Sequence, residues 1–336
     1  MKHIVSKSLR IALPFVLGFG IIYWMYRNSD IDEIADLMCH HMKWEWMLLS
    51  FIPGITAQVF RALRWQQALS PMGERCRTHV AICAIYLSYA SSLVIPRVGE
   101  FLRCGVLKKK DGVSYAKSLG TVVTERAVDT LLMMLLCLAV IVYQWQQFSD
   151  FFALTGVSIN ATLNKFTTNG ILVSAICTMG IIILITVLIR KLSLMRKVKN
   201  IMQGLVEGIM SVRHVKSIPL YVFYSVAIWV SYFFHYYLTF YCFGFTENIG
   251  LAAGLVSFCT GSIAVIVPTP NGLGPWHFAV KTILVLYGLN DQLAVSFALV
   301  VHTVQTLLLV VLGIYGLAYI QFAPSRNNPT SKSTEA

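Results

Sequence analysis

Two short stretches of this 336-residue chain place charged side chains inside apolar sequence. In one of them Glu125, Arg126 and Asp129 stand within five residues, and on a helix they share one face because residues three and four apart are neighbours. Each charge costs about 2.5–3.5 kcal/mol at the centre of a membrane helix, so such groups are paired or functional. Two interpretations stay open: a salt bridge that holds helices together, or a polar lining in which the carboxylates position Arg126 to receive an anionic group.

The second charged stretch follows a proline. Arg97, Glu100 and Arg103 come after Pro96 at three-residue spacing, which places them along one side of a helix that begins at this break. A helix start offers free N–H groups and the positive end of the helix dipole, and both suit a phosphate. The alternative is that Arg97 and Arg103 extend toward lipid headgroups at the cytoplasmic interface.

The elements that must position these residues are membrane helices. Hydrophobic residues make up 57% of the chain and charged residues 12%, whereas a soluble domain has about a quarter charged residues. Runs such as 171–189 and 295–320 reach the length of about 18 apolar residues that crosses a bilayer. The composition predicts an all-α integral membrane protein. The net charge of +12 does not indicate nucleic acid, because the polar domain that would carry a DNA-binding surface is missing from the sequence.

The distribution of Lys and Arg predicts the topology. Apolar runs occur at about 11–26, 46–63, 79–95, 118–146, 169–189, 218–243, 249–267, 277–288 and 293–320. Segments 1–10, 61–78, 97–117, 190–217 and 322–336 contain 22 basic residues together, against 3 in segments 27–45, 147–168, 244–248 and 289–292. Basic loops stay in the cytoplasm. We therefore expect both termini on the cytoplasmic side of a bacterial-type cell membrane.

The same count predicts two re-entrant hairpins. Because basic segments flank the run 79–95, this run begins and ends on one side, and we expect it to turn back near Pro96 and Gly99. A second broken hairpin is expected from the opposite face, with breaks at Pro268, Pro270, Gly272 and Gly274. Irregular backbone at membrane depth is tolerated only where protein shields it or where it lines a polar cavity.

An internal repeat accounts for both hairpins. Four residues recur with the same type 176 positions later in the chain. Gly112, Thr130, Leu131 and Leu132 correspond in this way to Gly288, Thr306, Leu307 and Leu308. The order of elements also repeats, once from the inside and once from the outside, as in inverted-repeat transporters. We expect one domain, 1–322, with repeats at about 1–146 and 169–321, six full spans and two hairpins. Eight plain spans are the alternative.

Other parts of the chain give weaker signals. His277 is the titratable side chain closest to the second break, and His302 pairs with Arg126 by the 176 offset; each is a candidate for a proton relay or for a hydrogen-bonded core histidine. Eight scattered cysteines show no metal-ligand spacing, and no catalytic or ATP-binding motif occurs, so we expect no metal and no cofactor. Residues 190–217 are expected to form a cytoplasmic amphipathic connection, and 323–336 a disordered tail.

The ordered motifs resemble one membrane family. Pro96-Arg97-Val98-Gly99-Glu100, Gly112-Val113-Ser114, Glu125-Arg126 with Asp129, and the stretch from Pro268 to Gly274 are similar to the lysylphosphatidylglycerol synthase transmembrane region, the flippase-like domain of the multiple peptide resistance factor. The resemblance implies a lipid flippase without the synthase domain, acting on an anionic or aminoacylated phospholipid or a polyprenyl-linked lipid, with a homodimer as an open alternative to a monomer. Relatives usually carry an acidic residue where this chain has Pro275-Trp276-His277.

Two other functions stay open from the sequence. One is an integral membrane transferase that acts on a lipid-linked substrate, with Glu125 or Asp129 as the base. The other is a secondary transporter of small solutes.

Overall fold

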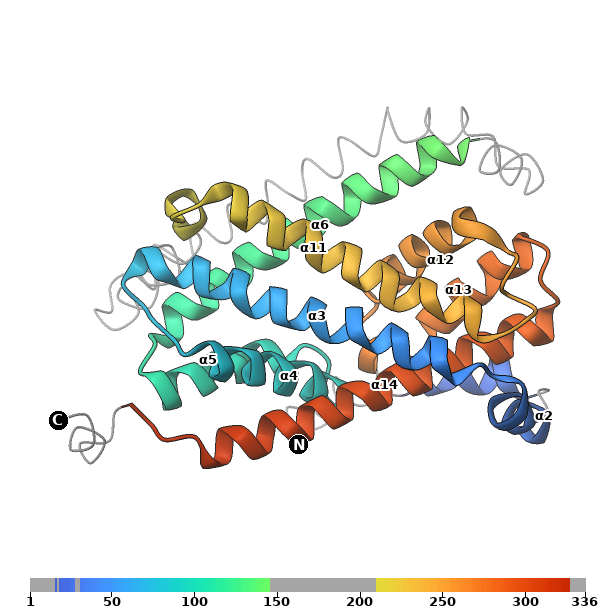
Figure 1. Cartoon of the computed structure of the whole chain (residues 1–336), viewed down its shortest axis with the longest axis horizontal. Coiled ribbons are helices and arrows are strands. Elements are labelled where there is room, and N and C mark those ends of the chain that lie inside the picture. The colour runs from blue at the N-terminus through green and yellow to red at the C-terminus, as the bar shows by residue number, and fades with distance from the viewer. Residues whose placement is uncertain (1–15, 17, 28–30, 146–209, 327–336) are drawn as a thin grey trace, which may run out of the picture.

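A computed structural model describes residues 16, 18–27, 31–145 and 210–326 (Figure 1). Every regular element in these residues is a helix, as predicted. Four helical segments are long and apolar enough to cross a membrane: α3 with its extension η2 (Trp44–Met72), α6 (Tyr115–Tyr143), α11 with η5 (Ile218–Cys242) and α14 (Asp291–Phe322). The span predicted at 169–189 and most of the connection 190–217 lie outside the described residues. The total of six spans therefore stays a prediction.

Shorter elements complete the described chain. Those near the ends of the long helices are α2 (Ile31–Asp36), η1 (Leu37–His41), η2 (Ser70–Met72), η4 (Ser211–His214) and η5 (Leu238–Cys242). Those of the two broken hairpins are α4 (Thr78–Val94), α5 (Val98–Asp111), α12 (Gly250–Ala264), η6 (Pro270–Gly272) and α13 (Pro275–Leu286).

The first predicted break separates α4 from α5, which lie side by side. Ile95 is extended and Arg97 has a left-handed backbone with φ of 64°, so the chain turns within three residues around Pro96. Gly99 allows the close approach of the two helices, because a Cβ at this position would overlap the backbone carbonyl of Ser88 on α4. The break is therefore built from residues that the sequence singled out.

The second predicted break separates α12 from α13, which also lie side by side. Gly272 and Gly274 have φ of 74° and 89°, a conformation that favours glycine over other residues. Across this pair, Gly261 of α12 lies against the indole of Trp276, where a Cβ would come within 2.9 Å of Nε1. Each hairpin thus has a glycine where its two arms touch.

The bounds of two helix pairs follow the 176-residue offset. The bounds of α6, shifted by 176, become 291–319, and α14 spans Asp291–Phe322. The bounds of α5 become 274–287, and α13 spans Pro275–Leu286. Gly112 and Gly288, which end the two shorter helices, both have positive φ. Whether the two halves have inverted orientations in a membrane stays a prediction.

Loops predicted to share a side meet at the same end of the molecule. At one end, Arg77 pairs with Asp111 at 2.7 Å and donates to the carbonyl of Pro324. At the other end, Lys43 pairs with Glu247 at 2.7 Å. This grouping agrees with the count of basic residues, and the side of the membrane that each end faces stays a prediction.

The first residues of the predicted tail, 323–326, contact the end of α5, and the disorder of the tail stays a prediction. Ser325 donates to the carbonyl of Lys109, and the backbone N–H of Arg326 donates to the carbonyl of Lys110. In the other direction, Nζ of Lys110 donates a hydrogen bond to the carbonyl of Ala323, which directly follows α14. The remaining residues, 327–336, lie outside the described part of the chain.

Candidate functional site

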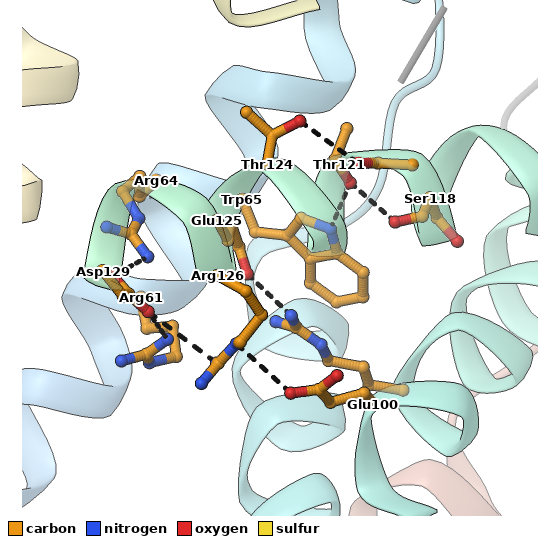
Figure 2. A network of polar contacts seen from close by, with 12 residues as sticks. Arg61, Arg64, Trp65, Glu100, Ser118, Thr121, Thr124, Glu125, Arg126 and Asp129 are labelled. Atoms are coloured by element: carbon orange, nitrogen blue, oxygen red, sulfur yellow. Dashed lines mark hydrogen bonds and ion pairs between the residues drawn. The ribbon is translucent and has the colours of Figure 1, made fainter. Parts of the chain in front are cut away.

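Asp129 is the middle residue of α6, and it is buried. Its carboxylate accepts hydrogen bonds from two arginines of α3, Arg61 at 2.7 Å and Arg64 at 2.8 Å (Figure 2). The side chains of Arg61 and Arg64 are 3% and 0% exposed. A single carboxylate therefore faces two cations that water does not reach, and this geometry joins α3 to α6.

Glu125 makes the second buried ion pair one helical turn away. Its Oε2 accepts from Arg103 of α5 at 2.6 Å, with both side chains at most 2% exposed. The guanidinium of Arg103 lies over the ring of Trp65, 4.5 Å from its centroid, and cation–π attraction is strongest over tryptophan. Trp65 in turn donates its indole N–H to Thr121 of α6. These contacts hold α3, α5 and α6 around one point.

Arg126 differs from the other arginines of the cluster because its side chain is 43% exposed. Its Nε lies 3.2 Å from Oε1 of Glu100, but the N–H does not point along a hydrogen bond, and its Nη2 lies 3.8 Å from Asp129. Glu100 is itself 29% exposed. Arg126 is thus held less tightly than the other arginines of the cluster, and it lies between Glu100 and Asp129 (Figure 2).

The charged network consists of seven side chains: Arg61, Arg64, Arg103, Arg126, Glu100, Glu125 and Asp129. Four guanidinium groups face three carboxylates, which leaves a surplus of one positive charge. Among the described residues, several buried atoms of the network have no hydrogen-bond partner, including Nε and Nη1 of Arg103 and Nε of Arg61. Buried donors without partners are rare because each costs about 1–3 kcal/mol. The network thus combines a surplus positive charge with buried donors, and with one buried acceptor, Oε1 of Glu125, that have no partner among the described residues.

Most of the charged residues predicted from the sequence come together. Glu100, Arg103, Glu125, Arg126 and Asp129 all belong to the network. Arg97 does not: it is exposed at the first break, and it makes no ion pair within the described residues. Glu125 and Asp129 are closed off in helix-joining ion pairs, which fits the salt-bridge interpretation, and the binding of an anionic group by Arg126 stays a prediction.

The sequence interpretation missed Arg61 and Arg64. Both were counted with the basic loop 61–78, whereas the structure places them inside α3, which continues to Leu69. A signal was present, because Trp65 and Ala68 continue an apolar pattern at three-residue spacing beyond Arg61, and both are fully buried. An apolar stripe that continues past a charged pair indicates that the helix, and not a loop, carries the charges.

The two histidines predicted near the second break also come together. The ring centroids of His277 and His302 are 4.4 Å apart, and Nε2 of His302 lies 3.1 Å from the carbonyl oxygen of Asn271. Both rings are buried. Their contacts are those of hydrogen-bonded core residues, and the proton relay stays a prediction.

Comparison with known proteins supports the resemblance drawn from the motifs. The model of one protein family, the lysylphosphatidylglycerol synthase TM region, matches residues 11–313. The comparisons with curated proteins and with solved structures each returned no match. The matched range contains both broken hairpins and the whole charged network, and the apolar helices are those of a multi-pass membrane protein. The chain belongs to the lysylphosphatidylglycerol synthase TM region family.

Proposed function

We propose that this protein moves a lipid with an anionic phosphate group between the leaflets of a cell membrane. The observation that carries the proposal is the partly exposed side chain of Arg126, which stands beside a buried network with a surplus positive charge. Arginine recognises phosphate well, because its planar donors match two oxygens at once. Translocation needs no covalent chemistry, so the protein acts as a transporter and not as an enzyme.

The phosphate first meets Arg126 from its open side. It then competes with Glu100 for the guanidinium, and this competition is favoured because the existing contact is long and poorly aligned. Glu100 belongs to α5, a short helix that joins α4 through a three-residue break. Release of Glu100 loosens the contact of the first hairpin with α6, which the ion pair of Arg103 with Glu125 still joins, and the free donors of Arg103 lie deeper in the same network. Lipid binding is thus coupled to a change in helix packing.

The two hairpins give the lipid a route across. We infer that they enter from opposite faces of the membrane, as an inverted repeat of six spans and two hairpins requires. Leu93, two residues before the first break, and Pro270 of the second break line the same cavity, so the ends of the hairpins are adjacent. Rocking of one half against the other then exposes this region to each leaflet in turn.

The test is lipid exchange in proteoliposomes that contain fluorescent phosphatidylglycerol and an impermeant quencher. Arg126→Ala is expected to slow exchange at least about tenfold, the equivalent of one charge-assisted hydrogen bond. Arg126→Lys should keep part of the rate, because it preserves the charge without the paired donors. Arg213→Ala is the matched control, because Arg213 is an exposed arginine of η4 outside the network.

Several outcomes contradict the proposal. If the folded Arg126→Ala protein exchanges lipid at an unchanged rate, Arg126 has no role in translocation. A new covalent product from labelled lipid and donor indicates the transferase instead, and uptake of a soluble solute without lipid exchange indicates a solute transporter. The same vesicles can report all three results.

A further inference from the structure

A cavity of about 280 Å³ lies where the two hairpins meet. Its lining comes from four parts of the chain: the N-terminal segment 18–27, the end of α4, the second break and α14. The lining residues that matter here are Phe19, Leu93, Asn271, His302, Thr303 and Thr306. Phe19 and Thr303 are exposed and His302 is buried, so the cavity opens at the molecular surface and closes toward His302.

The accessible lining of the cavity is mostly apolar, and its closed end carries polar groups without a charge. Asn271 donates its amide N–H to Oγ1 of Thr306 at 3.2 Å, and Thr306 lies 3.5 Å from Nδ1 of His302. Next to these groups, Oγ1 of Thr269 and Nε2 of His277 are buried, and neither has a hydrogen-bond partner within the described residues. Amide, hydroxyl and imidazole groups of this kind both donate and accept hydrogen bonds. They suit a hydroxyl group better than an ion.

No Asp, Glu, Lys or Arg lines this cavity in the described part of the chain. An ammonium group would find no counter-charge here, and a buried charge without a partner is costly. The three carboxylates of the charged network already face arginines. The two polar regions therefore differ in kind: one takes an anion, and the other takes uncharged polar groups.

The cavity and the charged network are neighbours along α4. The ring of Tyr89 lies 5.8 Å from the guanidinium carbon of Arg61, and its hydroxyl bonds to Tyr232. Leu93, which lines the cavity, follows Tyr89 by one helical turn on the same face of α4, a rise of about 6 Å. A headgroup that leaves the network along this face reaches the cavity next.

We propose that this cavity binds the uncharged, hydroxyl-bearing part of the lipid headgroup, so that the protein selects lipids whose phosphate carries the headgroup's sole charge. The inference rests on the proposed function and narrows its substrate class. It favours a glycerol or sugar headgroup and excludes an aminoacylated one. Two lipids have an uncharged, hydroxyl-bearing headgroup of this kind: phosphatidylglycerol, through its glycerol, and a polyprenyl phosphate sugar, through its sugar.

The test compares lipid affinities of the purified protein by native mass spectrometry. Phosphatidylglycerol and phosphatidylmethanol have the same phosphodiester charge and differ in the hydroxyl groups, and we expect phosphatidylglycerol to bind about tenfold more tightly, as one or two hydrogen bonds allow. The second pair consists of a polyprenyl phosphate hexose and the polyprenyl phosphodiester in which a methyl group replaces the hexose. A large ratio of the affinity for the hydroxylated lipid to that for the methyl lipid, in either pair, supports the proposal and shows whether the headgroup is glycerol or a sugar. A ratio near one in both pairs overturns the proposal.

Three variants assign the selectivity to this cavity. Thr306→Val removes a hydroxyl and should bring the ratio close to one, whereas Thr282→Val, which lies on α13 outside the cavity, should leave it unchanged. Thr303→Asp adds a carboxylate and should raise the affinity for lysyl-phosphatidylglycerol, which the native protein should bind at least tenfold more weakly than phosphatidylglycerol. Tight binding of the lysyl lipid by native protein contradicts the proposal.

Failure of the cavity and failure of the proposed function give different results. Arg126→Ala should weaken both members of each lipid pair equally and preserve their ratio. If it has no effect on any lipid while the ratios persist, the phosphate site is wrong and the cavity stands. If Arg126→Ala weakens the binding of every lipid, and the native protein binds both members of each pair equally well, the phosphate site stands and the cavity assignment is overturned.

Discussion

Replacing Asp129 by asparagine tests whether the charged network holds the helices together. The substitution keeps the shape of the side chain and removes the charge that faces two arginines at 2.7 and 2.8 Å. The surplus of the network rises from one positive charge to two, with both Arg61 and Arg64 at most 3% exposed. Removing one partner of a buried ion pair costs about 3–5 kcal/mol, so we expect Asp129→Asn to lower the free energy of unfolding by this amount.

An exposed ion pair of equal length provides the matched control. Lys43 and Glu247 also lie 2.7 Å apart, but their side chains are 47% and 42% exposed. Pairs in contact with water contribute about 0–1 kcal/mol, so Glu247→Gln should have a small effect. The difference between the two substitutions then measures burial and not distance.

The assay is equilibrium unfolding in mixed detergent micelles, applied to a double-mutant cycle. Arg64→Met in the Asp129→Asn background removes one of the two uncompensated cations, and it should recover about 2 kcal/mol of the loss. Two results would refute the reasoning: a loss for Asp129→Asn no larger than that for Glu247→Gln, or additive effects of the two substitutions in the cycle. Either result would mean that water reaches this part of α6.

Three further predictions concern the first hairpin, the topology and the thiol of Cys76. Gly99→Ala should destabilise the protein by about 1–3 kcal/mol in the same unfolding assay, because its Cβ would overlap the carbonyl of Ser88, whereas Gly105→Ala in the same helix meets no atom within 4 Å and should not; equal stability of the two variants would contradict the close contact. In single-cysteine variants, an impermeant maleimide should label exposed Cys39 in intact cells and Cys76 only after permeabilisation, and labelling of Cys76 in intact cells would reverse the orientation. Burial raises the pKa of Cys76 to about 12, so its labelling rate should increase about tenfold per pH unit from pH 7 to 9, and a plateau near pH 9 would indicate an ordinary thiol.

The sequence by itself determined the class of the protein, the two breaks and the charged face of α6. These features are local. The apolar runs need only their length, a proline removes its own N–H, and residues three and four apart share a helix face in any tertiary structure. For this reason Pro96 and Gly272 mark real breaks, and Glu125, Arg126 and Asp129 lie on one helix as expected.

Only the tertiary structure decided which charges neutralise one another. Asp129 and Arg126 are three residues apart, yet Nη2 of Arg126 stays 3.8 Å from the carboxylate, while Arg61 and Arg64 of α3 come within 2.8 Å. The position of α3 against α6 sets this choice, and it depends on packing between residues more than sixty positions apart. The packing buries the cations of α3 and leaves Arg126 partly exposed, and spacing along the sequence cannot specify this outcome, because it depends on which face of α3 lies against α6.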